Sequence, residues 1–309
     1  MPDMFDVSSP DGLIHLYEDG AFSRRELIAK LKRHTGSAAK AVAILSAAGL
    51  GAARSSSAEA ACGCPDDVRV PEDSPDIEAQ MVEYAGQSSS IFAYLVRPAA
   101  QADPQPGIVV IHENQGLTEY IKDVTRRVAR AGYVGLGVDL LSRLGGTPQF
   151  KTPEERTAAY QKVGGQAFLE DLLSSVEYFK TVDRVKEGSL GSVGFCAGGL
   201  NSFNLAVNSP DISAAVSFYP GGLPPTFDAV EKLAGPYMGI FPELDRGTTP
   251  RMPALVSALL EKQKRFEMHV YQGTNHAFHN DTGPRYDRAA ACDAWAQTTA
   301  FFNRNLRKA

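Results

Sequence analysis

The chain has 309 residues, long enough for one large α/β domain with an appended segment or for two small domains, and its composition, 43% hydrophobic and 22% charged, is typical of a globular protein. Its net charge of -5 argues against a nucleic-acid partner, since such proteins present a basic face, and no stretch is long and apolar enough to span a membrane. Four cysteines (Cys62, Cys64, Cys196 and Cys292) are too few for a disulfide scaffold. No zinc-ligand spacing or phosphate-binding loop occurs, so the sequence predicts neither a metal nor a cofactor.

Residues 1–65 differ in composition from the rest of the chain. Arg24 and Arg25 precede an Ala-rich apolar run at 38–50, and the small residues at 55–61 contain an A-x-A pattern. In this order the features resemble a twin-arginine signal, which predicts export to the periplasm. The alternative is a helical arm of a cytoplasmic protein, with one amphipathic helix over 11–32 and a second over 38–52.

After residue 70 the sequence alternates between apolar strands and amphipathic helices. Strands are predicted at 77–84, 91–96, 107–111, 133–138, 189–195, 212–219, 236–241 and 266–271, the first two joined as a hairpin. Helices are predicted at 121–131, from Pro153 for a short length, and at 168–182, 198–207, 250–264 and 285–302. For residues 66–309 this predicts an α/β-hydrolase-like architecture: a mostly parallel, doubly wound sheet of about eight strands with helices on both faces.

Cys196 lies where the strand at 189–195 turns directly into a helix, in the order Gly194-Phe195-Cys196-Ala197-Gly198. This spacing is typical of a nucleophile elbow, with Cys in the place usually held by Ser. A tight turn leaves no room for Cβ atoms at the two glycines, and the positive end of the helix dipole favours a thiolate. The alternative is a small buried hydrophobic Cys, whereas the G-x-G-x-x-G spacing of a dinucleotide site is absent.

Asp245 and His276 each follow a predicted strand, at the sheet edge where functional groups gather. The order Cys196, Asp245, His276 is that of α/β-hydrolase triads. We expect Cys196 to attack an acyl carbon and form a thioester, His276 to move the proton, and Asp245 to hold the imidazole. The backbone N–H groups of Ala197 and Asn114 are predicted to bind the oxyanion.

Four segments together resemble the dienelactone hydrolase (carboxymethylenebutenolidase-like) family over about residues 75–305. They are the elbow Gly-Phe-Cys-Ala-Gly-Gly, the run at 112–117, the Asp245 loop and the run at 276–281. The resemblance implies an α/β-hydrolase fold and a carboxylesterase-type hydrolase of small esters or lactones without a cofactor. It also implies that Glu113 holds the resting thiol and is displaced by substrate; a carboxylate that only caps the following turn is the alternative.

One position departs from the family pattern. In the dienelactone-specific enzymes an Arg four residues after the catalytic His binds the substrate carboxylate, and this chain has Asn280 there, predicted to lie at the mouth of the pocket. Arg156 is the possible counterpart of a second family Arg, and Tyr219 and Phe278 complete the predicted substrate pocket. Because Asn cannot form a bidentate ion pair, we expect a neutral ester or lactone as substrate. A non-catalytic binding protein, a peptidase or an acyltransferase on the same fold are the alternatives, and the sequence leaves the oligomeric state open.

Overall fold

The computed structural model describes residues 9–18, 24–47, 68–100 and 103–307. The described strands are β1 (Ile77–Ala85), β2 (Ser90–Pro98), β3 (Gln105–Ile111), β4 (Val134–Val138), β5 (Val185–Phe195), β6 (Ile212–Phe218), β7 (Tyr237–Pro242) and β8 (Phe266–Tyr271). The described α-helices are α1 (Pro10–Glu18), α2 (Arg24–Thr35), α3 (Ala38–Ala47), α4 (Glu119–Arg130), α5 (Pro153–Val163), α6 (Gly165–Thr181), α7 (Ala197–Asn208), α8 (Met252–Glu261) and α9 (Arg288–Leu306).

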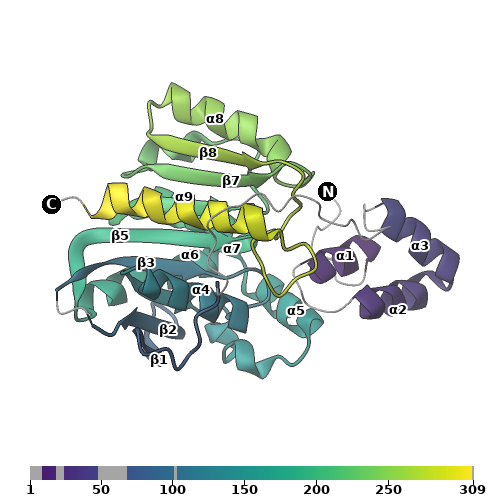
Figure 1. Cartoon of the computed structure of the whole chain (residues 1–309), viewed down its shortest axis with the longest axis horizontal. Helices are drawn as coiled ribbons and strands as arrows, with labels where there is room; N and C mark the ends of the chain where they lie inside the picture. Colours follow the sequence, from purple (N-terminus) through teal and green to yellow (C-terminus); the bar gives the residue numbers. More distant parts are fainter. Residues whose placement is uncertain (1–8, 19–23, 48–67, 101–102, 308–309) are drawn as a thin grey trace.

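The strands form one eight-stranded sheet in the order β1-β2-β4-β3-β5-β6-β7-β8 (Figure 1). The hairpin β1–β2 is antiparallel, and β2 also pairs antiparallel with β4, whereas every pair from β4 to β8 is parallel. Connections between parallel strands need crossovers, and the helices supply them on the two faces of the sheet. The prediction of a mostly parallel α/β-hydrolase sheet of about eight strands is therefore confirmed.

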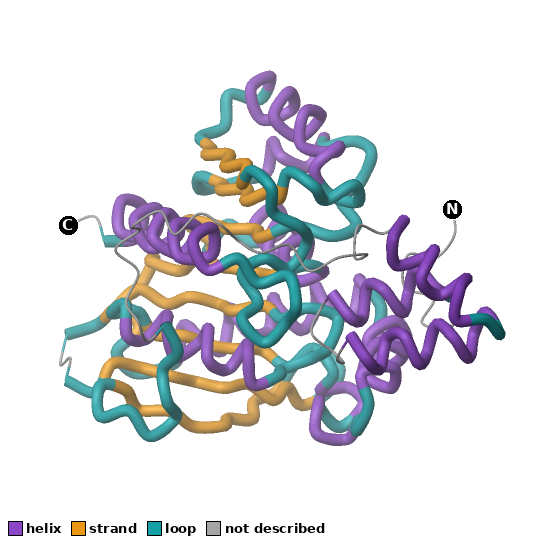
Figure 2. Tube along the Cα trace, turned by 45° about the vertical axis from the view of Figure 1, so that its right-hand side comes forward, coloured by secondary structure: helices purple, strands orange, loops and turns teal. Residues whose placement is uncertain are grey.

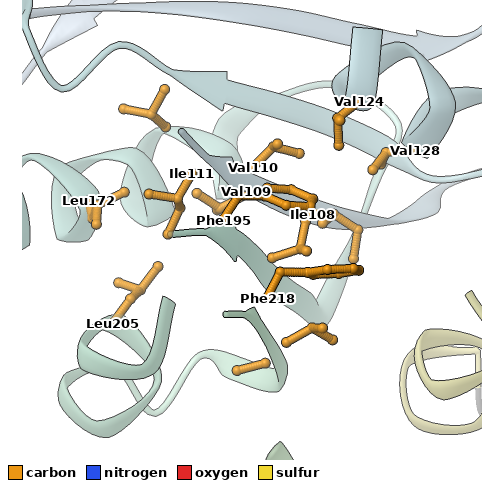
Figure 3. Packing of buried hydrophobic residues seen from close by; sticks show 14 of the residues in the cluster. Ile108, Val109, Val110, Ile111, Val124, Val128, Leu172, Phe195, Leu205 and Phe218 are labelled. Carbon is orange, nitrogen blue, oxygen red and sulfur yellow. The ribbon is translucent and has the colours of Figure 1, made fainter. Parts of the chain in front are cut away.

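The core lies on both sides of the central strand β3, whose residues from Ile108 to Ile111 are fully buried. Figure 3 shows Val124 of α4 on one side of this strand and Leu172 of α6 with Leu205 of α7 on the other. Because side chains alternate along a strand, a central strand covered on both faces must be apolar at every position. This double coverage holds the carboxyl end of β3 in a fixed position beside the amino end of α7.

The first three helices gather at one end of the molecule, beside α5 (Figures 1 and 2). They bury a cluster of their own, separate from the main core, made of Leu13, Ile14, Leu16, Tyr17, Leu27, Leu31, Ala41 and Leu45. Lys30 of α2 also forms an ion pair with Glu154 of α5. The segment predicted as one helix over 11–32 forms two, since α1 ends at Glu18 and α2 begins at Arg24.

Part of the predicted export signal, the small residues at 55–61, lies outside the described residues, as do Cys62 and Cys64. Both a signal and an arm can be helical, so export stays a prediction. Cys292 is disulfide-bonded, whereas Cys196 is not in a disulfide. In the described part of the chain, no helix has both the length and the apolar character that crossing a membrane requires.

Candidate active site

Cys196 occupies a strained backbone position between β5 and α7. Its φ is +54° and its ψ is -121°, a backbone conformation that residues other than Gly rarely adopt. Its side chain is fully buried. A Cβ at Gly194 would lie 1.9 Å from the carbonyl oxygen of Gly198. A Cβ at Gly198 would lie 2.4 Å from the carbonyl oxygens of Ile111 and His112. The two glycines are therefore required for the close approach of backbone segments, as the elbow prediction anticipates.

Asp245 and His276 are joined by a hydrogen bond, with 2.6 Å between Asp245 Oδ2 and His276 Nδ1. The Thr248 hydroxyl also donates to Oδ2 at 2.6 Å, and the Gly247 and Thr248 N–H groups donate to Oδ1 at 2.8 and 3.1 Å. Burial alone would raise the pKa of Asp245, but the adjacent His276 and these donors outweigh it and hold the pKa well below its usual range. Asp245 is therefore an ionised, fully bonded partner for the imidazole.

The Asp245 carboxylate determines the tautomer of His276. An ionised carboxylate can only accept, so Nδ1 carries the proton and Nε2 bears the lone pair that a general base uses. The His276 ring packs against the ring of Tyr219, with 5.0 Å between the ring centroids. Tyr219 in turn lies close enough to Cys196 for the thiol to influence the pKa of its phenol. Tyr219 therefore links the elbow and the His276 loop.

Tyr219 follows β6 and is fully buried at a φ of +36°, so it is a second strained residue at this edge of the sheet. Its hydroxyl interacts with that of Tyr120, although not in good hydrogen-bond geometry. Burial, together with the neighbouring Tyr120 and Glu113, raises the pKa of Tyr219 well above its ordinary value. The phenol therefore stays protonated near neutral pH and keeps an O–H that can donate.

Glu113 is 2% exposed and lies in the turn after β3. Asn280 Nδ2 donates to Glu113 Oε2 at 3.1 Å, while Asn280 Oδ1 accepts from the N–H and the hydroxyl of Thr282 at 3.0 and 2.7 Å. Asn280 is itself only 1% exposed. The side chain predicted to face substrate at the pocket mouth is thus turned inward and holds a carboxylate of the protein.

The predicted oxyanion donors lie on two backbone segments that touch. Ala197 is the first residue of α7, so its N–H has no acceptor within the helix. Asn114 is fully buried in the turn after β3, next to the His112 carbonyl that approaches Gly198. The Asn114 side-chain Nδ2 has no acceptor among the described residues. The two segments therefore lie next to each other, beside Cys196.

The other two predicted pocket residues, Phe278 and Arg156, contact different residues of the site: Phe278 contacts Tyr219, and Arg156 contacts Gln115. Phe278 is fully buried and packs edge-on against Tyr219, with 5.7 Å between centroids, so it supports the Tyr219 ring from the core. Arg156 of α5 is partly buried, and burial lowers its pKa; its Nε donates to the Gln115 side chain at 3.4 Å. Arg156 therefore reaches the residue that follows Asn114.

Sequence reasoning did not identify three residues that contribute to the candidate site. Thr248 braces Asp245, and the spacing of Asp followed three residues later by Thr, which favours an Asx-type turn, could have indicated it. Tyr120 of α4 lies beside Glu113, and its hydroxyl bonds to Nδ1 of the buried His279 at 2.8 Å. His112, which the sequence marks only as part of the run at 112–117, is fully buried directly after β3. No three His, Cys, Asp or Glu side chains of the described residues cluster as metal ligands would.

Comparison with known proteins gives a consistent result. The model of the Dienelactone hydrolase family matches residues 91–306. A Saccharolobus solfataricus protein named "Putative carboxymethylenebutenolidase" is 30% identical over 256 residues, covering 72% of this chain and 96% of that protein. A Bradyrhizobium protein named "Probable 2-oxo-3-(5-oxofuran-2-ylidene)propanoate lactonase" is 28% identical, covering 74% and 96%. The solved structure of a Klebsiella pneumoniae protein described as "Putative Dienelactone Hydrolase" superposes with a TM-score of 0.68 at 26% identity, covering 74% of this chain and 99% of that one.

Proposed function

Because this chain belongs to the dienelactone hydrolase family, which makes it an ester or lactone hydrolase, we propose that it acts through a Cys196–His276–Asp245 triad and a thioester acyl-enzyme. The observation that carries the proposal is the backbone of Cys196, held at a φ of +54° at the amino end of α7. Strain of this kind persists where the surrounding structure fixes it, and it gathers at functional sites.

In the proposed first half-reaction, His276 Nε2 takes the proton of the Cys196 thiol while Sγ attacks the acyl carbon of the substrate. The carbonyl oxygen becomes an oxyanion, which accepts hydrogen bonds from the N–H groups of Ala197 and Asn114. Collapse of this intermediate breaks the ester C–O bond, and His276 returns the proton to the leaving alkoxide. With a lactone, the alcohol formed stays attached to the acyl group.

In the second half-reaction, His276 takes a proton from water, and the hydroxide attacks the thioester carbon. The C–S bond then breaks, the acid is released, and the thiolate recovers its proton from His276. Asp245 stays ionised throughout and stabilises the imidazolium formed in each half. This role agrees with the low pKa that its donors impose.

Glu113 is proposed to hold the thiol between turnovers, supported by its burial next to Tyr120 and Tyr219, which itself lies by Cys196. The Tyr219 hydroxyl, whose contact with Tyr120 lacks good hydrogen-bond geometry, is proposed as a donor to substrate. A neutral ester or lactone is the proposed substrate class, because Asn280 stands at the family Arg position and its amide is engaged by Glu113.

The test is the hydrolysis of a small aryl ester by the wild type and by Cys196→Ala. We expect the substitution to abolish turnover, and stoichiometric iodoacetamide to label Cys196 in the wild type with matching loss of activity. Cys196→Ser should retain partial activity, because the elbow geometry serves both nucleophiles. Full activity of Cys196→Ala would refute the proposed triad. A wild type that binds esters without hydrolysing them would favour the non-catalytic alternative.

We also propose that the segment before about residue 65 directs export to the periplasm. The order of arginine pair, apolar run and small residues supports this, as does the disulfide at Cys292, since disulfides persist in oxidising compartments. Replacing Arg24 and Arg25 together by Lys should retain the protein in the cytoplasm with its amino terminus attached. If mass spectrometry of the native protein places its amino terminus near Met1, the segment is a helical arm.

A further inference from the structure

His112 directly follows β3 and is fully buried, and each nitrogen of its ring has a backbone partner. Nε2 lies 3.0 Å from the backbone N of Leu140, and Nδ1 is hydrogen-bonded to the carbonyl oxygen of Glu113. The ring therefore bridges the loop after β3, which carries Glu113 and Asn114, and the loop after β4, which begins at Asp139.

The partners of His112 fix its tautomer. The Leu140 N–H can only donate, so Nε2 must accept, and the proton of the neutral ring is on Nδ1. Nδ1–H therefore donates to the Glu113 carbonyl. Burial lowers the pKa of His112 below its ordinary value, despite the opposing influence of Asp139, so the ring is neutral near neutral pH and both bonds are kept.

The loop after β4 is a firm anchor for this ring. The Asp139 carboxylate accepts from the Leu141 N–H at 3.0 Å, and from the Thr147 N–H and hydroxyl at 2.7 and 2.8 Å. The Thr147 hydroxyl oxygen also accepts from the Leu117 N–H at 2.8 Å, which fastens the far end of the loop after β3. The backbone between His112 and Leu117 is thus held at both ends.

The bond to Glu113 has a consequence for the next residue. The Glu113 carbonyl and the Asn114 N–H belong to one planar trans peptide, so they point in opposite directions. Fixing the carbonyl in the direction of the His112 ring therefore fixes the N–H on the other side of the peptide plane. The same loop contacts the start of α7, where a Cβ at Gly198 would lie 2.4 Å from the His112 carbonyl oxygen.

We propose that His112 is a positioning residue of the oxyanion hole: its Nδ1–H clamps the Glu113–Asn114 peptide so that the Asn114 N–H faces the oxyanion formed at Cys196. This inference rests on the proposed function. The Nε2 bond to Leu140 contributes to the stability of the loops, whereas the Nδ1 bond contributes to the rate. The two ring nitrogens therefore have separable effects.

Three variants separate the two bonds. His112→Ala loses both. His112→Asn places an amide N–H near the position of Nδ1 and keeps the clamp, whereas His112→Gln places an amide oxygen near the position of Nε2 and keeps the Leu140 bond. Removing one oxyanion donor lowers kcat by about 10²- to 10³-fold, so we expect His112→Ala and His112→Gln to lose at least about tenfold in kcat, with KM within about twofold. His112→Asn should recover most of that loss relative to His112→Ala.

The rate at which iodoacetamide alkylates Cys196 distinguishes positioning from collapse of the site. Alkylation forms no oxyanion, so its rate should be the same in the three variants and the wild type, and the melting temperature reports the Leu140 bond. The proposal is overturned if His112→Gln keeps the wild-type kcat, or if His112→Asn loses kcat as far as His112→Ala does while its alkylation rate is normal. A fall in kcat that parallels the fall in alkylation and melting temperature would also overturn it. Each of the Asn and Gln variants is decisive alone if the other fails to fold. If Cys196→Ala stays active instead, the proposed function fails, and this is seen without any His112 variant.

Discussion

Gly198→Ala tests whether the two segments that we propose to bind the oxyanion must touch. The added Cβ would lie 2.4 Å from the carbonyl oxygens of both Ile111 and His112, which are backbone atoms and cannot rotate away. A close carbon–oxygen contact begins at about 3.3 Å, so α7 or the loop after β3 must move by about 0.9 Å. This displacement separates the segment that carries Ala197 from the one that carries Asn114.

The expected result is a large loss of rate with a moderate loss of stability. A misplacement of about 1 Å in an active site costs about 10²-fold in rate, so kcat should fall by about two orders of magnitude. Inserting a methyl group into a packed site costs about 1–3 kcal/mol in the free energy of unfolding. In a domain of this size each kcal/mol lowers the melting temperature by about 2–4 °C.

The assay is kcat and KM on a small aryl ester, with thermal unfolding measured on the same preparations. Gly165→Ala is the matched control, because a Cβ at Gly165, the first residue of α6, has no atom within 4 Å. We expect the control to keep the wild-type kcat. A Gly198→Ala enzyme with a lowered melting temperature but the wild-type kcat would show that contact of the two segments is not needed for catalysis, and the reasoning would be refuted.

Three other predictions concern the remaining parts of the site. Asp245→Asn should lower kcat by about 10³- to 10⁴-fold through the wrong tautomer of His276. Because the pKa of Asp245 is depressed in the folded state, its stabilisation is present above about pH 4 and lost as pH falls, so melting temperatures from pH 7 to pH 3 should fall less in the variant than in the wild type. Asn280→Leu removes the donor to Glu113 and should lower the free energy of unfolding by about 1–3 kcal/mol. Thr282→Val removes only the hydroxyl that donates to Asn280 and should lower it by less. Equal losses in the two variants would contradict the Glu113 contact. Wild type should have a higher kcat/KM for a neutral ester than for an anionic one of similar size, and a tenfold preference for the anionic substrate would show that a cation elsewhere binds the carboxylate.

Apolar runs predict the parallel strands well, because a strand covered on both faces has no position where a polar side chain reaches water. The start of β5 shows where this signal ends. The strand was expected from residue 189, but it begins at Val185, which pairs with Gln105 of β3. Lys186 and Glu187 hide this part of the strand because it runs beyond the buried centre of the sheet. Pairing between distant segments, and not local composition, extends it.

The site divides in the same way. Glycine spacing at the elbow and the positions of Asp245 and His276 after strands are local signals, and the sequence carries them. The direction of the Asn280 side chain depends on Glu113, 167 positions away, and the bond between Tyr120 and His279 spans 159 positions. No periodicity encodes such contacts, since only the assembled sheet brings these residues together. The spacing of four residues from His276 led us to expect the Asn280 side chain at the mouth of the pocket. It could not predict that this side chain contacts Glu113.

The strain at the elbow illustrates how distant contacts make a local motif work. The Cys196 N–H donates to the Phe218 carbonyl at 3.1 Å, and the Cys196 carbonyl accepts from the Gly221 N–H at 3.0 Å, so the end of β6 and the residues that follow it hold the elbow on both sides. Tyr219 lies inside that segment, with its own positive φ and its N–H donating to Ile240 of β7 at 2.7 Å. Two unfavourable backbone conformations therefore stabilise each other across neighbouring strands, and neither could persist if the segment were loose. The position of Cys196 is set by three strands together, so the glycines that permit the turn are necessary for this geometry but not sufficient.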